Sequence, residues 1–404
     1  MRLHPILAAL TRHKIPVSLL VLQVALTLAV LSNSSFMLAD YLRRISIDSG
    51  IAEERLGILK LMPYTEQQTV DVNARVSQYL RGLSGVSDVG LINTVPFGPR
   101  EADLGVRLAW EDQKNQVGAH VFTLGPDTFQ SLGLELIAGR LPMPSDFVES
   151  ASTLPASGTV YVTQALAERL WPDDGALGKT IYVNASRFTI VGVIRHLLRP
   201  EFELQPLDQS DWSLAVPMSP GAGLYGNYVF RAPASQLEST LASIRRSFAK
   251  EVPGLAVDEQ NTQSVAALRS MYLQGDKSVM GMLASIVLLT LITTMLGIVG
   301  LTSYWVRRRR RQIGVRRALG ATRWAIASYF IVENGMIMIA GCTLGIALAY
   351  AVNLELMRYY SLGRLPLVYL PVTFIFMIVA GQLAALGPAL KGSRVQPVDA
   401  IREA

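Results

Sequence analysis

Charge and cysteine are both scarce in this chain of 404 residues. Charged residues make up 17% of it, whereas soluble domains average about 25%. The single cysteine, Cys342, excludes an intrachain disulfide and a cysteine-rich metal site. The four histidines are scattered along the sequence, so a histidine metal cluster is not expected either. Half of the residues are hydrophobic, which indicates that part of the chain avoids water.

Long uncharged runs make up that part. A helix needs about 20 apolar residues to cross roughly 30 Å of hydrocarbon. The sequence predicts four transmembrane spans, at residues 15–38, 278–306, 325–352 and 368–390. The first could also be a cleaved signal peptide, because basic residues precede it. Its uncharged length and the lack of a clear cleavage site favour an uncleaved anchor.

Basic residues are distributed unevenly around these spans. The two terminal segments, 1–14 and 391–404, and the linker 307–324 together hold 14 Lys and Arg residues and 2 acidic ones. Residues 40–277 hold 21 basic and 27 acidic residues. Since short cytoplasmic flanks are enriched in Lys and Arg, we expect both termini and the linker in the cytoplasm. The large segment 39–277 and the short loop 353–367 then lie outside.

The most basic stretch directly follows the 28 uncharged residues from Val279 to Val306. Arginine runs also occur in nucleic-acid patches and nuclear signals. Against a span they are better explained as a topology anchor that can contact anionic lipid headgroups, so no nucleic-acid partner is expected. The predicted anchor consists of Arg307, Arg308, Arg309, Arg310 and Arg311.

The fold class that follows is a membrane protein with an α-helical transmembrane domain of four spans, arranged one plus three. A large α+β extracytoplasmic domain is inserted between spans one and two. Strand, helix and strand patterns at 55–63, 65–83 (with Thr65 as N-cap) and 86–95 recur at 226–232, 234–252 and 254–260. Two βαβ-like halves, about 50–97 and 223–277, therefore flank an inserted subdomain of about 98–222.

The inserted subdomain contains one misleading motif. The stretch "GALGKT" (175–180) resembles a phosphate-binding loop, but Asp173 stands where that loop requires glycine. A helix is predicted before it, at the end of 158–172, and two strands follow within 179–197, joined by a turn at 184–186. That order is the reverse of strand, loop and helix, so we expect a simple turn. No other catalytic signature is present, and a binding or force-transmitting module is expected.

Three stretches together resemble the MacB/FtsX-type ABC transporter permeases. The stretches "FQSLGLELIAGR" (129–140) and "VYVTQALAERLWPDDGALGKTIYVNASRFTIVGVI" (160–194) are similar to the family's periplasmic core domain. The stretch "RRRRRQIGVRRALGATRWAIASYFIVENGMIMIAGCTLGIALA" (307–349) is similar to its R-x-x-E-I-G-[IV]-R-[RK]-A-[LI]-G-A pattern and third span. The tail "GPALKGSRVQPVDAIR" (387–402) is similar to the C-terminal motif, through Pro388, Pro397 and Arg402.

The resemblance implies a permease subunit, not an enzyme, in the cytoplasmic (inner) membrane of a bacterium. Such permeases pair with cytoplasmic ABC ATPase subunits and form dimers with a second copy or a paralogue. ATP and Mg²⁺ would be bound by the ATPase, and no cofactor by this chain. Only 14 residues precede the first span, so a separate ATPase polypeptide is expected. A periplasmic adaptor and membrane lipid are further expected partners.

Export or efflux is the function this resemblance favours. An FtsX-like mechanotransmitting regulator of an extracytoplasmic partner and a lipoprotein-extracting permease remain alternatives. A membrane-anchored sensor without any ATPase is a further alternative from a different class.

The element expected to contact the ATPase is a coupling helix in the linker. With Ile313 to Arg323 as a short helix, apolar and basic residues fall on opposite sides. An interfacial anchor helix without a partner is the alternative. Two positions depart from the family pattern: Gln312 replaces the usual Glu, and Thr163 replaces a common Asn. The predicted coupling residues are Gln312, Ile313, Gly314, Val315, Arg316, Arg317, Ala318, Leu319, Gly320, Ala321 and Thr322.

Within the predicted spans the one acidic residue is Glu333. Intramembrane ionisable groups are costly and usually face protein or water, so we expect a structural role, with proton relay as the alternative. Glycines at 335, 341 and 345 predict close helix packing nearby. The second span exceeds the length needed to cross a bilayer, which predicts a protruding stalk, with a joint at Gly275.

Overall fold

The computed structural model describes residues 14–394, apart from 65–67, 100–102, 113, 203–205 and 361–362. The chain divides into two compact units. The helical unit comprises Met1–Arg43 and Asp276–Ala404, and the α+β unit comprises Arg44–Gly275. The predicted N-cap Thr65 and the tail residues Pro397 and Arg402 lie outside the described residues.

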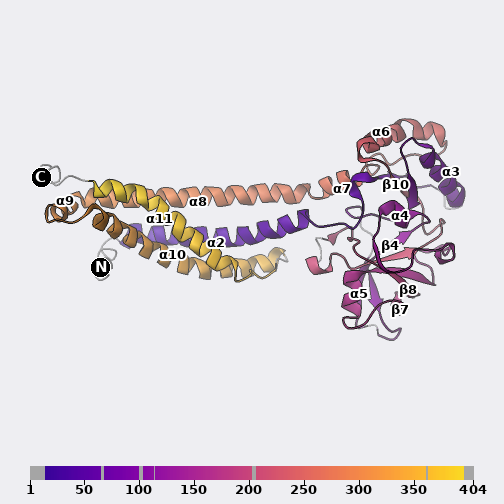
Figure 1. Ribbon diagram of the computed structural model, residues 1–404, viewed down its shortest axis with the longest axis horizontal. Coiled ribbons are helices and arrows are strands. Elements are labelled where there is room, and N and C mark those ends of the chain that lie inside the picture. Colours follow the sequence, from indigo (N-terminus) through magenta and orange to yellow (C-terminus); the bar gives the residue numbers. More distant parts are fainter. Residues whose placement is uncertain are drawn as a thin grey trace. The chain divides into compact units, whose positions relative to one another are not determined.

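Among the described residues, four helices are long and apolar enough to cross a membrane (Figure 1). One precedes the α+β unit in the chain and three follow it, which confirms the predicted fold class. They contain or closely match the predicted spans. These helices are α2 Lys14–Ile45, α8 Gln274–Arg308, α10 Arg323–Tyr360 and α11 Tyr369–Ser393.

Polar side chains of α2 connect it to each of the other three long helices. The hydroxyls of Thr27 and Thr294 on α8 lie 2.7 Å apart. The hydroxyls of Ser32 and Thr373 on α11 lie 2.8 Å apart. Asn33 on α2 donates from Nδ2 to the carbonyl oxygen of Ala349 on α10 at 3.0 Å. Because an apolar surrounding offers no competing water, such hydrogen bonds hold helices together in a bilayer.

Glycines allow α10 to approach its neighbours closely. A Cβ atom built on Gly341 would lie 2.7 Å from Val24 of α2, and one on Gly345 would lie 2.9 Å from the carbonyl oxygen of Ala25. A Cβ on Gly335 would lie 2.8 Å from Nε2 of Gln382 on α11. The close packing predicted from these three glycines is therefore confirmed.

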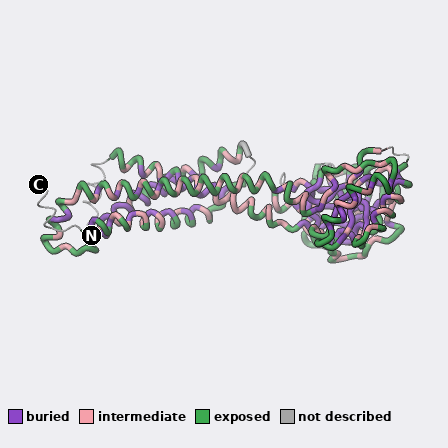
Figure 2. Tube along the Cα trace, turned by 90° about the horizontal axis from the view of Figure 1, so that it is seen from above, coloured by how far each residue is buried: buried purple, intermediate pink, exposed green. Residues whose placement is uncertain are grey.

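Helix α8 packs through one narrow face. Of its 35 residues only Thr294, Ile298, Thr302 and Trp305 are buried, at a spacing of three or four. Figure 2 shows that the long helices carry exposed residues along much of their length, whereas buried residues fill the interior of the α+β unit. At 1.5 Å per residue, α8 is roughly 52 Å long, more than the hydrocarbon thickness.

The predicted joint before the second span lies at a different residue. Gly275 is helical, and the break between α7 (Val265–Tyr272) and α8 falls at Leu273. The side chain of Leu273 is buried against Phe97 and Phe202. The break thus coincides with a buried apolar residue that packs in the α+β unit, and not with the glycine.

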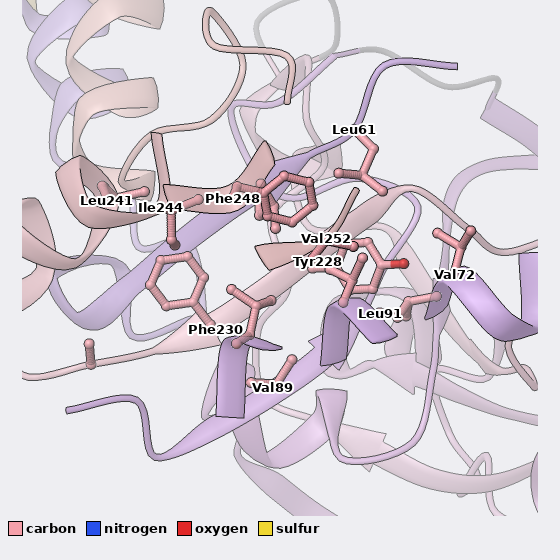
Figure 3. Close-up of a cluster of buried hydrophobic side chains, with 14 of the residues drawn as sticks. Leu61, Val72, Val89, Leu91, Tyr228, Phe230, Leu241, Ile244, Phe248 and Val252 are labelled. Carbon is pink, nitrogen blue, oxygen red and sulfur yellow. The ribbon is translucent and has the colours of Figure 1, made fainter. Parts of the chain in front are cut away.

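The first sheet of the α+β unit is antiparallel, in the order β1-β10-β2. Helices α3 and α6 pack on one face of this sheet and form a hydrophobic core with it. Side chains such as Val72, Leu91, Tyr228 and Phe248 meet in this core (Figure 3). Neighbouring residues on the same strands, including Val229, belong to a second cluster, as strand alternation requires. The elements are β1 Leu56–Lys60, β10 Asn227–Arg231, β2 Asp88–Leu91, α3 Thr69–Gly82 and α6 Ala234–Glu251.

Two predictions for this sheet are corrected. The expected halves do not form separate βαβ units, because β10 pairs between β1 and β2. The strand expected at 254–260 is only an isolated bridge between Leu61 and Val257. In that stretch Gly254 has φ +86°, and Asp258 accepts from the Asn261 amide, so the chain turns before a strand can extend.

The second sheet closes on itself. Its order is β5-β8-β6-β9-β4-β3-β7, and β7 also pairs with β8, so six strands form a ring with β5 attached at β8. Apolar side chains such as Val121, Val162 and Phe188 cluster together in it. The strands are β3 Asp103–Arg107, β4 Val117–Leu124, β5 Leu136–Gly139, β6 Ser157–Thr163, β7 Thr180–Val183, β8 Ser186–Ile194 and β9 Ser213–Pro217.

Short helices complete the α+β unit. Helix α5 follows β6 directly, as predicted, and Thr163 at that junction donates its hydroxyl proton to the carbonyl of Asp211. The hairpin predicted around 184–186 is also confirmed, since Val183 pairs with Ser186. The short elements are η1 Glu53–Arg55, α4 Thr128–Leu132, η3 Pro144–Asp146, α5 Gln164–Leu170 and η5 Leu207–Gln209.

The stretch that resembles a phosphate loop is a turn between α5 and β7. The side chain of Lys179 contacts residues of its own segment: its Nζ lies 2.6 Å from Oδ2 of Asp174 and 4.9 Å from the centre of the Trp171 ring. The hydrogen bond from Lys179 lowers the pKa of the Asp174 carboxyl. The prediction of a simple turn is confirmed.

Candidate functional site

The linker between α8 and α10 forms helix α9, Arg310–Ala318, which ends earlier than predicted. The amide of Gly320 donates to the carbonyl of Arg317 at 3.1 Å, and that of Ala321 to the carbonyl of Arg316 at 3.0 Å. These two bonds form a Schellman motif, which places a residue with positive φ after the helix. Gly320 has φ +94°. The expected continuation of this helix to Arg323 is therefore wrong.

Helix α10 begins immediately afterwards. The hydroxyl of Thr322 accepts a hydrogen bond from the amide of Ala325 at 3.1 Å, as an N-cap does. The segment "ALGAT" (318–322) is thus a tight corner between two helices: Gly320 ends α9, and the N-cap Thr322 of α10 follows two positions later. A fixed corner gives α9 a defined direction relative to α10.

The predicted apolar side of the linker is exposed in the helical unit. Leu319 is 83% exposed, Val315 47% and the neighbouring Trp324 67%. The apolar residue of α9 that packs against the long helices is instead Ile313. Gly314 is also buried, Arg317 and Ala321 are half-buried, and the exposed remainder comprises Gln312, Arg316, Ala318, Gly320 and Thr322.

An ion pair that sequence reasoning missed lies beside α9. Nη1 of Arg309 is 2.8 Å from Oε2 and 3.1 Å from Oε1 of Glu333 on α10. The Glu333 side chain is 1% exposed and that of Arg309 15%. The guanidinium also lies over the rings of Trp305 and Tyr329, at 5.8 Å from each centre. Acidic residues inside spans often pair with a basic residue, so the single acid within the predicted spans, Glu333, was the available signal.

The five arginines of the predicted anchor therefore do not share one environment. Arg307, Arg308 and Arg311 are exposed, while Arg310 is half-buried. Arg308 donates to the hydroxyl of Tyr304 at 2.8 Å. Arg309 faces the protein interior and is not available to a lipid headgroup.

The other end of α9 contacts α11. Nη1 of Arg317 donates to the carbonyl oxygen of Ser393, the last residue of α11, at 3.1 Å. Pro388 of the C-terminal motif lies inside α11, where it cannot donate a backbone hydrogen bond. Gln312 lines a small hollow of about 30 Å³ together with Arg309, Arg316 and Tyr329.

The α+β unit contains cavities that the sequence did not indicate. The largest of those described has a volume of about 630 Å³ and lies between the end of β1 and the start of β10. Lys60, Tyr64, Asn93 and Asp258 are among its lining residues. These four residues come from three separate segments of the chain and carry no shared motif, so only the fold brings them together.

Two family models match the chain. The model described as "MacB-like periplasmic core domain" matches residues 17–268, more than half of the chain. The model described as "FtsX-like permease C-terminal" matches residues 284–397. The first match includes most of α2 and the α+β unit as far as the first half of α7, and the second includes most of α8 and all of α9, α10 and α11.

Curated relatives carry related names. The ABC transporter permease YknZ of Bacillus subtilis is 25% identical over 358 residues, which are 85% of this chain and 84% of that protein. The macrolide export ATP-binding/permease protein MacB of Neisseria gonorrhoeae is 23% identical over 295 residues. That alignment covers 70% of this chain but only 44% of that protein.

Two solved structures of similar proteins align with about half of this chain and with nearly all of their own. The extracellular domain of YknZ from Gram-positive bacteria covers 50% of this chain and 98% of its own, with 18% identity and a TM-score of 0.33. The periplasmic region of MacB from Actinobacillus actinomycetemcomitans covers 56% and 97%, with 15% identity and a TM-score of 0.35. By its two family matches, the chain belongs to the MacB/FtsX-type family of ABC transporter permeases.

Proposed function

We propose that this permease couples ATP hydrolysis by a separate cytoplasmic ATPase to a conformational change of its α+β unit, most directly for export. The observation that carries the proposal is α9. This helix lies in an arginine-rich linker, is fixed at both ends, and leaves Val315 and Leu319 exposed. An exposed apolar side chain flanked by basic residues suits insertion into a groove of a partner protein.

The same placement supports the orientation. Basic residues cluster at the α8–α10 linker, and the positive-inside rule puts such a cluster in the cytoplasm. With the linker inside, both termini lie inside and the α+β unit lies outside the bacterial inner membrane. Export is proposed because MacB relatives are named for macrolide export; dimerisation and an extracytoplasmic adaptor belong to the same proposal.

Affinity purification of the tagged full chain from native membranes tests the proposal. We expect a polypeptide with a G-x-x-x-x-G-K-[ST] loop to co-purify and the isolated complex to hydrolyse ATP. A chain that purifies without any ATPase after chemical crosslinking in intact membranes would contradict the proposal, and would favour the sensor alternative.

A further inference from the structure

We infer that the ion pair of Arg309 and Glu333 is a clamp that fixes the start of α9 to α10, so that a displacement of α9 is passed to α10 as well as to α8. Both are positioning residues: neither is proposed to contact ATP or a transported molecule. The inference rests on the proposed function, because α9 is the element that an ATPase would move.

The clamp lies at the junction of two helices. Helix α8 ends at Arg308 and α9 begins at Arg310, so Arg309 is the one residue between them. Its backbone has φ −100° and ψ 13°, outside the ordinary helical values. The direction of α9 depends on the dihedral angles at this residue. Anchoring the Arg309 side chain to α10 therefore restricts the angle between α8 and α9.

Stability alone is a poor explanation for this pair. Removing two charges from water costs several kcal/mol per ion, and apolar residues of similar size often stabilise a protein as well or better. What an ion pair adds is a defined geometry. Here one nitrogen contacts both carboxylate oxygens, and the Trp305 and Tyr329 rings flank the guanidinium. The guanidinium can occupy few other positions.

A second contact ties the opposite end of α9. Arg317 donates to the carbonyl of Ser393 at the end of α11, and Ile313 between them packs in the core of the long helices. Helix α9 is thus attached to α8 through the chain, to α10 through Glu333 and to α11 through Ser393. With these attachments a movement of α9 acts on three spans together.

Hydrogen exchange of the full chain in nanodiscs, followed by mass spectrometry, tests the clamp without an ATPase. We expect Arg309→Met and Glu333→Gln each to raise the exchange rate of the amides of residues 310–318 about tenfold or more, while α2 and α11 keep their protection. Arg309→Lys, which keeps the charge, is expected to stay within about threefold of the wild type.

Two matched controls lie in the same unit. Arg308→Met removes the neighbouring exposed arginine, and Glu355→Gln removes an exposed acid of α10 paired with Arg358. Neither should change exchange in α9. Unchanged α9 exchange in Arg309→Met and Glu333→Gln overturns the inference. So does an equal change in Arg308→Met, a general rise across α2 and α11, or a loss of protection in Arg309→Lys.

The clamp and the proposed function can fail separately. In a complex with its co-purified ATPase, Glu333→Gln should retain the ATPase but lose most of the ATP-driven change in the distance between spin labels at Val70 and Leu354, both of which are exposed. A wild-type change in that distance with a loosened α9 would overturn the transmission role and leave the proposed function standing. If no ATPase co-purifies, the proposed function fails. The transmission role depends on that function and is then overturned as well, whereas the hydrogen-exchange result for α9 still stands.

Discussion

Leu319→Asp is expected to reduce stimulation of the ATPase by the permease at least tenfold while leaving the permease folded. Leu319 is 83% exposed, so its replacement removes almost no internal packing. Exposed substitutions of this kind usually change stability by no more than about 0.5 kcal/mol. A carboxylate would, however, be costly to bury in an apolar groove of a partner. ATP hydrolysis by the reconstituted complex measures the effect.

The matched control is Leu367→Asp. Leu367 is 70% exposed and lies in the short loop between α10 and α11, at the opposite end of these helices from α9. It should leave ATPase stimulation unchanged. If Leu319→Asp and Leu367→Asp behave alike, with both at the wild-type rate, α9 is not the coupling element.

Gly345→Leu is expected to prevent correct assembly of the helical unit. A Cβ on Gly345 would already lie 2.9 Å from the Ala25 carbonyl oxygen and 3.0 Å from Cβ of Leu28. Three more carbons cannot fit between α2 and α10 unless the helices separate. Overpacking typically costs about 1–3 kcal/mol, and separation would also break the hydrogen bond from Asn33 to Ala349. The yield of monodisperse protein in detergent measures the loss.

Gly300→Leu provides the comparison for that variant. Gly300 is on α8, where a Cβ would meet nothing within 4 Å in the chain. The monodisperse yield of Gly300→Leu should be close to that of the wild type, and therefore several-fold higher than that of Gly345→Leu. Equal yields from Gly345→Leu and the wild type would show that α2 and α10 do not pack as closely as the structure indicates.

The spans could be predicted from the sequence because one physical requirement dominates them. A bilayer demands about 20 apolar residues in helical form, and runs such as Val279 to Val306 meet it without tertiary information. The three spaced glycines at 335, 341 and 345 were informative in the same way, since each lies where a Cβ would meet a neighbouring helix, whereas a Cβ on Gly300 of α8 would meet nothing within 4 Å.

Features that depend on tertiary placement could not be predicted in the same way. The pairing of β10 between β1 and β2 joins segments more than 130 residues apart, and local patterns carry no signal for such pairing. The end of α9 was misplaced because helical periodicity continues through Leu319 and Thr322, whereas Gly320 and the N-cap at Thr322 favour a corner. At this position the capping hydrogen bonds, and not the apolar periodicity, mark the end of the helix.

Gln312 stands where the pattern resembled in the sequence would have Glu, and it lies beside the site. It is exposed and shares a hollow with Arg309 and Arg316. A carboxylate in its place would face these two guanidinium groups and could compete with Glu333 for Arg309. With an amide at 312, the clamp to Glu333 has no such competitor at this position.

The central claim is that hydrolysis by a partner moves the α+β unit through α9. A direct test measures the distance between spin labels at Val70, on α3, and Leu354, on α10, in a Cys342→Ala background of the reconstituted complex. Both labelled positions are exposed. We predict that the distance distribution shifts during ATP turnover and that Leu319→Asp abolishes the shift. An identical distribution with and without ATP, in a complex that hydrolyses ATP, would contradict the account.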